Sequence, residues 1–374
     1  MQWRFGPAVV AWTMLALPAR AWRHQTALDC LAKTRAVAGL AYPSDAEKHF
    51  DEVHRALAPW ISASYPHTHG GYSGPWLENH WIGHFGAAAA ASRKRGGKLR
   101  DVFGEYIPLL VPWVDLWVNT KSGDRVLKVD KYHYPGGFAQ ALLNATRPSV
   151  RYVTVSQNAE GLEARDALMR RWFTGRGNVL VLSAGGYGHV ALPLLKQVEP
   201  RNNQRNPADR GFFVSFVGSL HTAPCREAMR EAVERSSVGV RVFVGQAPDW
   251  RQVMADSRFS LCPRGFGRTS YHLAETMNMG LVPIHVYADV PWVPYPALYR
   301  RYGFLARADE LPALLQSFRH NVTDAALKRR EAAVLAFSES HFTYDAVMLQ
   351  IRAFLRDGAS DLRCVRLPDS PTGA

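Results

Sequence analysis

The segment 258–286 constrains the fold of this chain more than any other stretch. It contains two short apolar runs, 259–262 and 281–286, which indicate buried strands. Between them lie a loop rich in arginine and glycine and then a segment long enough for a helix. Two strands joined in this way predict a strand-loop-helix-strand unit in a parallel sheet, and therefore an α/β fold.

The loop at 264–268 reads Arg-Gly-Phe-Gly-Arg and cannot continue the first strand. Thr269 or Ser270 supplies the hydroxyl cap that begins the helix, and Gly280 ends it. In such a unit, free backbone N–H groups and the positive end of the helix dipole face the crevice at the carboxyl end of the first strand. A phosphate group fits there.

Side chains around this loop suit a nucleoside diphosphate. Gly265 and Gly267 permit a close approach of the backbone to an anion. Arg264 and Arg268 carry planar, permanent charges that match the oxygens of a diphosphate. Ser270 stands at the start of the helix, beside the same expected phosphate position.

Glu275 is the expected ligand of the ribose. It lies four residues after Tyr271 and seven after Arg268, so the three side chains would share one face of a helix. Plainer interpretations exist, because a lone Gly-x-Gly is a weak signal and Glu275 could pair with Arg268 on the surface. The order of all the parts favours a nucleotide-diphosphate site.

The same block resembles the exostosin-like glycosyltransferases (glycosyltransferase family 47), whose pattern is F-x-L-C-P-x-G, Ser, E-A, G-x-(I/V)-P-V, Asp and Pro-Phe or Pro-Tyr. The matching residues here are Phe259, Leu261, Cys262, Pro263, Gly265, Ser270, Glu275, Gly280, Val282, Pro283, Asp289, Pro294 and Tyr295. The chain departs from the pattern at His272, where Arg is frequent, and at Thr276. Members are inverting enzymes, and the resemblance implies their α/β fold: two doubly wound Rossmann-like domains that face across a cleft (GT-B type).

The second half carries further candidates for binding a nucleotide-sugar donor. The segment 214–219, which includes Gly218, resembles together with Arg226 the first strand and turn of the family's donor-binding half. Asp289 either holds sugar hydroxyls or caps a turn. No Asp-x-Asp triplet of the kind that holds a metal in other transferases occurs in the sequence. We therefore expect turnover without a metal or other cofactor, with manganese as the ion to test.

The general base is sought in the first half of the chain. The segment 65–85 is rich in glycine and aromatic residues, and Glu78 with its aromatic neighbours resembles a Glu of the family. His84 lies in the same segment, and His189 follows a glycine loop at the carboxyl end of a predicted strand. Glu78, His84 and His189 are the candidate catalytic residues, although each also fits a structural or binding role.

Four histidines of the segment 65–85 raise the alternative of a metal site. They are His67, His69, His80 and His84. No carboxylate–histidine spacing of a known zinc type accompanies them, and His and Trp are ordinary sugar-binding residues. We therefore expect no metal ligands here.

Strand and helix signals run in two series separated by the polar segment 200–210. The predicted organisation is a signal peptide or truncated anchor at 1–22, an acceptor-side Rossmann-like domain at 23–205, a nucleotide-sugar-binding Rossmann-like domain at 206–340, and a C-terminal helix and tail at 341–374 that packs back on the first domain.

Local patterns in the first half predict three more features. Residues 106–118 read as an apolar strand broken by prolines, and 160–173 read as a helix with one apolar face. Ser44 and Glu47 form a capping box at the start of an earlier helix.

The net charge of +13 favours anionic partners, such as nucleotide sugars and acidic glycans. No zinc-finger, homeodomain or RNA-recognition signature appears, and basic and aromatic residues do not interleave, so nucleic-acid binding is disfavoured. An apolar run at 8–17 and glycosylation acceptors at Asn144 and Asn321 favour the secretory pathway, with the Golgi lumen or membrane as the destination. A disulfide between Cys30 and Cys364 would join the two ends, although the sequence does not fix the pairing.

The functional hypothesis is an inverting transfer of a sugar from a nucleoside-diphosphate donor, with uridine diphosphate favoured, to a hydroxyl of a glycan or glycoprotein. The positive net charge of the chain favours an acidic acceptor, and a homo- or hetero-dimer is an open alternative. The alternative is a catalytically silent sugar-binding or partner subunit of the same fold.

Overall fold

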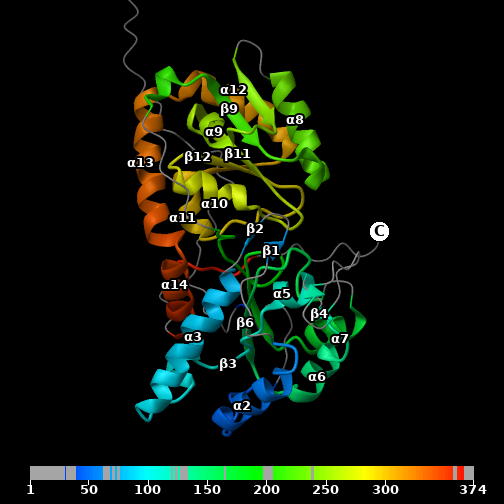
Figure 1. Ribbon diagram of the computed structural model, residues 1–374. Helices are drawn as coiled ribbons and strands as arrows, with labels where there is room; N and C mark the ends of the chain where they lie inside the picture. Colours follow the sequence, from blue (N-terminus) through cyan, green and yellow to red (C-terminus); the bar gives the residue numbers. More distant parts are fainter. Residues whose placement is uncertain are drawn as a thin grey trace, which may run out of the picture.

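The computed structural model describes residues 30, 39–61, 68–69, 72–73, 76–118, 121–122, 125–126, 134–163, 166–196, 205–236, 240–356 and 360–365. Two parallel β-sheets organise these residues, one from each half of the chain (Figure 1). The first sheet has the order β3 (Ile107–Pro108), β6 (Tyr152–Ser156), β7 (Val179–Ser183) and β8 (Val190–Ala191). The second sheet has the order β10 (Val242–Gly245), β9 (Phe212–Val217), β11 (Ser257–Pro263), β12 (Val282–Val286) and β13 (Phe304–Ala306).

Helices accompany both sheets. Those of the first half are α2 (Ala46–Leu57), α3 (Leu77–Lys94), α4 (Arg100–Phe103), α5 (Trp113–Val118), α6 (Phe138–Ala145) and α7 (Ala167–Arg176). Those of the second half are α8 (Pro224–Ser236), α9 (Trp250–Ala255), α10 (Tyr271–Asn278), α11 (Pro296–Tyr302), α12 (Leu311–Asn321), α13 (Asp324–His341) and α14 (Tyr344–Arg356). Two short antiparallel hairpins, β1 (Thr68–His69) with β2 (Tyr72–Ser73) and β4 (Lys121–Ser122) with β5 (Arg125–Val126), complete the described elements. None of the described helices is long and apolar enough to span a membrane.

The unit β11–α10–β12 confirms the strand-loop-helix-strand prediction at the centre of the second sheet. β11 and β12 are parallel, with Phe259 opposite Val282. Ser270 occupies the N-cap position of α10, and Gly280, with φ of 72°, ends the helix in a left-handed conformation that glycine adopts without strain.

Three local predictions in the first half are wrong. Residues 106–118 do not form one strand: the Pro112 carbonyl accepts the N–H of Leu116, and the chain continues as α5. The helix expected at 160–173 begins only at Ala167, because the Asp166 carboxylate caps the N–H groups of the first turn. The capping box at Ser44 does not form.

Where the capping box was expected, α2 begins at Ala46, with Asp45 as its N-cap residue. The Asp45 side chain does not cap the helix. Its two carboxylate oxygens accept from the Arg147 guanidinium at 2.7 and 2.8 Å. The guanidinium of Arg147, 102 residues further along the chain, therefore determines the role of Asp45. The local sequence pattern does not predict this pairing.

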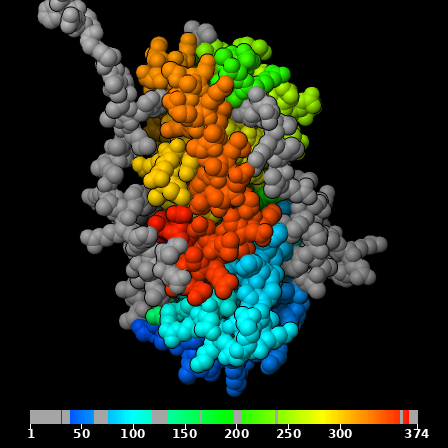
Figure 2. Space-filling view, turned by 90° about the vertical axis from the view of Figure 1, so that its left-hand side faces the viewer, coloured from blue at the N-terminus to red at the C-terminus, as the bar shows by residue number. Residues whose placement is uncertain are grey.

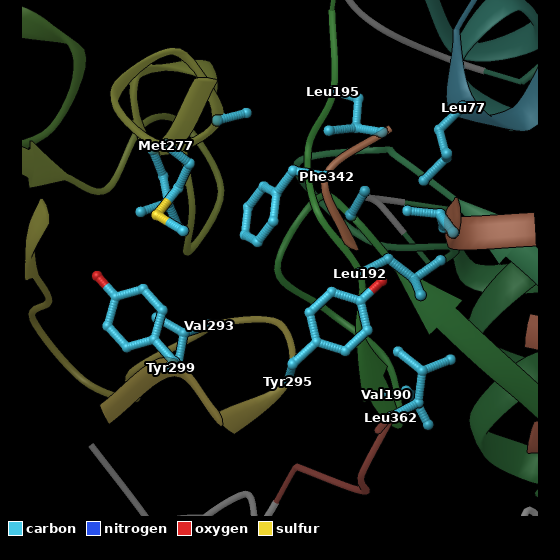
Figure 3. Packing of buried hydrophobic residues seen from close by; sticks show 14 of the residues in the cluster. Leu77, Val190, Leu192, Leu195, Met277, Val293, Tyr295, Tyr299, Phe342 and Leu362 are labelled. Carbon is cyan, nitrogen blue, oxygen red and sulfur yellow. The ribbon is translucent and has the colours of Figure 1, made fainter. Parts of the chain in front are cut away.

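A continuous apolar core joins the two sheets on one side. Figure 3 shows Tyr295 and Phe342 of the second half beside Leu192 and Leu195, which follow β8, and all four belong to one buried cluster. Near them, the Trp292 indole N–H donates to the Ser183 carbonyl at 3.1 Å, at the end of β7. These contacts fix the end of the first sheet against the second half.

The end of the chain returns to the first half. In Figure 2, α13 and α14 run down one face, and α14 lies beside α3. A disulfide joins Cys30 and Cys364, the pairing that would connect the two ends. Residues 1–22 and the first part of the expected linker, 200–204, lie outside the described residues, so the proposed boundaries stay predictions.

Candidate functional site

The carboxyl ends of strands from both sheets meet at one cavity of about 560 Å³. Its walls include residues one or two positions beyond the carboxyl ends of four of these strands, namely Gln157 and Asn158 after β6, Gly185 after β7, Gly218 and Ser219 after β9, and Gly265 after β11. The carboxyl edge of a parallel sheet is the usual place for a ligand in an α/β protein. Here two such edges face each other.

The beginning of α10 forms part of the cavity wall. Thr269, Ser270, Tyr271 and His272 line the cavity, so the positive end of the α10 dipole faces it. The Ser270 hydroxyl does not cap the helix but donates to the Pro263 carbonyl at 2.8 Å. The start of α10 therefore offers a favourable position for an anion.

Arg226 of α8 places a guanidinium group in the same wall. Its Nε donates to the Arg264 carbonyl at 2.8 Å, its Nη1 donates to the Ser219 carbonyl at 2.7 Å, and its charge lies over the Phe216 ring. The side chain thus connects two loops and sets a fixed positive charge beside the start of α10. A planar guanidinium held in this way suits a phosphate oxygen.

Glu275 lies in the wall one turn further along α10 and is a buried carboxylate. It forms an ion pair with Lys196, and its Oε2 lies 3.2 Å from His272 Nδ1. Burial by itself would raise the pKa of Glu275, but the hydrogen bonds and charges of His272 and Lys196 outweigh it and lower the pKa to about 2. The carboxylate is therefore charged and able to accept hydroxyl groups.

A second cavity of about 500 Å³ adjoins the first and shares Val217, Gly218 and Glu275 with it. Its other lining residues are Lys196, Gln246, Ala247, Pro248 and Trp250. It therefore combines an aromatic ring, a side-chain amide and two opposite charges. Together the two cavities offer adjoining places for a planar ring, for hydroxyl groups and for an anion.

Aromatic residues line the first cavity on the side of the first sheet. Trp76 and Trp117 lie in its wall, Tyr271 of α10 also lines the cavity, and Phe266 is a lining residue that is 79% exposed. The Gln157 side-chain N–H donates to the Tyr271 hydroxyl at 2.9 Å, which connects the two halves across the cavity. Aromatic faces of this kind can stack on sugar rings.

Arg264, Arg268 and Asp289 do not line the cavity, contrary to the arrangement expected from the sequence. Arg268 Nε donates to Asp289 Oδ2 at 2.8 Å, and Arg264 Nη1 lies 3.3 Å from Asp289 Oδ1. Arg268 also lies over the Tyr187 ring. The expectation that Arg268 shares a helix face with Glu275 is wrong, because α10 begins only at Tyr271 and Arg268 lies in the loop before it.

The loop glycines have unequal surroundings. A Cβ atom at Gly267 would lie 1.7 Å from the Gly185 carbonyl oxygen, and one at Gly186, whose φ is 111°, would lie 2.3 Å from the Arg268 nitrogen. At Gly265, the nearest atom would be the Thr269 carbonyl oxygen at 3.1 Å. Gly267 and Gly186 therefore let the loops of the two halves touch, a use that the sequence interpretation did not foresee.

Glu78 lies behind the cavity wall. Its carboxyl group is fully buried and accepts the N–H groups of Gln157 at 2.6 Å and Val114 at 2.8 Å, two residues that line the cavity. Burial raises the pKa of Glu78 to about 8, against the opposing effect of these two hydrogen bonds. Its role as a base stays a prediction.

The two candidate histidines lie away from the cavity. His84 is exposed on α3. His189 is buried, accepts the Val181 N–H at Nδ1 at 2.9 Å, and has its pKa lowered to about 4 by burial. Neither lines either cavity.

The remaining histidines of the segment 65–85 add no metal site within the described residues. His80 stacks on Tyr344 with the ring centroids 3.8 Å apart. His67 and the side chain of His69 lie outside the described residues. No group of three His, Cys, Asp or Glu side chains in the described part of the chain is arranged to hold a metal ion.

Sequence reasoning missed several residues of the cavities, namely Trp76, Trp117, Gln157, Lys196, Gln246 and Trp250. For the tryptophans, the unusual density of aromatic residues between 65 and 118 was the available signal. Lys196 and Gln246 stand alone in their segments, and no motif marks them.

Fold and site together define an α/β protein with two parallel sheets and a ligand-sized cavity at their carboxyl ends. No protein-family model matches the chain. The chain is similar to a probable glycosyltransferase of Arabidopsis thaliana, with 23% identity over 112 residues, or 29% of this chain. The match covers 21% of that relative, so the chain aligns with about a fifth of its length.

Comparison with solved structures finds distant likenesses at low sequence identity. One is an α1,3-fucosyltransferase, with 17% identity, a TM-score of 0.28, and coverage of 42% of this chain and 48% of that chain. Another is the GtfA/B complex, with 13% identity, a TM-score of 0.32, and coverage of 61% of this chain and 50% of that chain. TarM gives 8% identity and a TM-score of 0.32, with coverage of 61% and 48%.

Proposed function

We propose that this protein is a glycosyltransferase that binds a nucleoside-diphosphate sugar in the two adjoining cavities. The observation that carries the proposal is the lining of these cavities. The start of α10 and the Arg226 guanidinium line the first cavity, and the charged carboxylate of Glu275 lines both. The Arabidopsis relative supports the same class of activity.

Each part of such a donor has a matching position. The diphosphate lies at the start of α10, beside Arg226 and Gly218, where the helix dipole and a fixed positive charge favour an anion. Two ribose hydroxyls donate to Glu275. The sugar then lies in the first cavity, near Trp117 and Tyr271.

The exostosin-like membership and the two-domain GT-B organisation belong to this proposal. The two parallel sheets with facing carboxyl edges support it. An inverting transfer is a single displacement: the acceptor hydroxyl attacks the anomeric carbon, the bond to the diphosphate breaks, and a base takes the hydroxyl proton. Uridine diphosphate is the favoured carrier and a glycan hydroxyl the favoured acceptor, in the secretory pathway or Golgi.

Arg226 and the start of α10 would stabilise the charge of the departing diphosphate. We therefore propose metal-independent turnover. Chelation should leave the rate unchanged, and loss of activity that manganese restores would contradict this part of the proposal.

The candidate base nearest the cavity is Glu78, because both residues that donate to its carboxyl group line the cavity. Glu78→Gln should lower turnover far more than donor binding if Glu78 is the base. Equal loss of both would instead indicate a positioning role.

A second candidate function is a catalytically silent, sugar-binding partner subunit. Glu78, His84 and His189 all lie outside the cavity walls, which favours this alternative. Donor hydrolysis by the purified chain separates the two functions, since only an enzyme releases the nucleoside diphosphate.

The test of the proposal is a turnover assay of the purified chain with a panel of nucleoside-diphosphate sugars, reading the released nucleoside diphosphate. We expect release with at least one donor and a strong reduction in the Glu275→Gln variant. The variant Glu231→Gln, at a solvent-exposed position of α8, is the matched control for nonspecific loss. Absence of both release and binding for every donor would refute the proposal.

A further inference from the structure

His272 contacts the carboxylate of Glu275 directly. The two residues lie three positions apart on α10, so their side chains share one face of the helix. His272 lines the first cavity, and Glu275 lines both. His272 Nδ1 lies 3.2 Å from Glu275 Oε2. Because a charged carboxylate can only accept hydrogen bonds, Nδ1 is the donor in this contact.

The rest of the His272 ring is held by residues of the second sheet and of α10. Its Nε2 lies 3.3 Å from the Ser260 hydroxyl of β11, and that hydroxyl lies 2.9 Å from the Thr276 hydroxyl. Ser260 and Thr276 are fully buried. The Phe216 ring of β9 packs edge to face against the imidazole, with the centroids 5.4 Å apart. Rotation of the ring would break these contacts, so the direction of the Nδ1 donor is fixed.

The Glu275 carboxylate has a partner on each of its two oxygens. Lys196 pairs with Oε1, and His272 pairs with Oε2. The terminal torsion of a glutamate side chain is broad, so the backbone and the helix do not set the plane of the carboxylate. Partners at both oxygens do set it. Each oxygen can accept more than one hydrogen bond, so hydroxyl groups can still bind while both partners stay in place.

A ribose offers two neighbouring hydroxyl groups. One carboxylate can accept both, one at each oxygen, when its plane faces the sugar. Without the donor at Oε2, the carboxylate of Glu275 could turn about its terminal torsion, and only one of the two hydroxyls would keep good geometry.

We propose that His272 is a specificity-determining residue for ribonucleotides: it orients the Glu275 carboxylate so that both neighbouring hydroxyls of a ribose bind to it. His272 acts through Glu275 and is therefore a positioning residue. This role rests on the proposed function, in which Glu275 holds the ribose of the donor. The site would then distinguish a ribose from a 2′-deoxyribose.

The experiment measures the affinities of uridine diphosphate and 2′-deoxyuridine diphosphate by titration calorimetry, for the wild-type chain and two variants of His272. The wild type should bind uridine diphosphate about tenfold to a hundredfold more tightly than the deoxy form, the range expected for a hydrogen bond to a charged group. The variant His272→Asn keeps a donor as many bonds from the backbone as Nδ1, and it should keep most of this preference. The variant His272→Gln places its amide at the distance of Nε2 instead, and the preference should fall by at least about fivefold.

Asn278→Ala is the matched control on the same helix. Asn278 is buried and accepts the Ser338 hydroxyl at 2.6 Å, but it lines neither cavity. Its loss should lower the melting temperature and leave the preference for uridine diphosphate unchanged. Melting temperatures of all variants show whether each one folds.

The outcomes separate the role of His272 from the proposed function. A preference that survives in His272→Gln, or that falls equally in His272→Asn and His272→Gln, would show that the Nδ1 contact does not carry it. Equal binding of the two nucleotides by the wild type would also overturn the role of His272, while the proposed function would stand. If no nucleotide, including guanosine diphosphate, binds the wild-type chain, the proposed function itself fails.

Discussion

Gly267→Ala is the sharpest structural test of how the two halves meet. The new Cβ atom would lie 1.7 Å from the carbonyl oxygen of Gly185, whereas ordinary carbon–oxygen contacts are about 3.3 Å. The loops must therefore separate by about 1.5 Å, and neither can yield through a side chain, because the opposing atom belongs to the backbone. Overpacking of this kind costs about 1–3 kcal/mol.

The assay is thermal unfolding of the variant beside two reference chains. For a chain of 374 residues, a loss of about 1–3 kcal/mol corresponds to a fall of about 1–4 °C in melting temperature. Gly265→Ala is the matched control, since it lies in the same loop and its new Cβ meets its nearest atom at 3.1 Å. It should change the melting temperature by little.

Gly186→Ala adds an independent check on the same contact. Its Cβ would meet the backbone nitrogen of Arg268 at 2.3 Å, from the opposite loop. Because Gly186→Ala and Gly267→Ala push the same loops apart, their combined effect should be smaller than the sum of the two. An unchanged melting temperature for Gly267→Ala would refute this reasoning and would restore the interpretation of a free phosphate-binding loop.

Three further predictions concern stability. Arg210→Met should lower the free energy of unfolding in urea by about 3–5 kcal/mol, because the buried Glu331 carboxylate loses the two guanidinium contacts at 2.5 and 3.0 Å. Replacing both residues by apolar ones should lower it less. Cys30→Ser removes the bridge to Cys364 and should cost about 2–5 kcal/mol, whereas equal stability with and without reductant in the wild type would contradict the disulfide. Burial raises the pKa of Glu78 from 4.5 to about 8, so between these pH values the folded chain holds a proton that the unfolded chain loses. The resulting contribution to the free energy of unfolding is full below about pH 4.5 and disappears as the pH rises through 8. The difference in the free energy of unfolding between wild type and Glu78→Gln, measured at several pH values, should show this fall.

The second sheet was predictable where its pattern is local. Apolar runs bounded by loop residues identified β11 and β12, and a glycine with positive φ ended α10 where expected. The first half was less predictable, since Pro112 starts a helix inside an apolar stretch and Arg147 takes the side chain of the residue that precedes α2. Both outcomes depend on the tertiary structure.

The residues of the candidate site were also predictable only where the signal is local in the sequence. Several candidate residues line the first cavity, namely Gly218, Arg226, Gly265, Gly267, Ser270 and Glu275, and their role in binding a nucleotide stays a prediction. The roles of the loop arginines could not be predicted, because they depend on where the loops of both halves meet in space.

Two contacts illustrate this limit. Arg268 pairs with Asp289, which lies 21 residues away in another loop. Lys196 reaches Glu275 from the other half of the chain, and nothing in its own neighbourhood marks it as part of a site.

The most direct test of the central claim is a crystal structure of the chain with bound uridine diphosphate. We predict the diphosphate at the start of α10, within hydrogen-bond distance of Arg226, and the ribose hydroxyls on the carboxylate of Glu275. A nucleotide bound elsewhere on the molecule would contradict it.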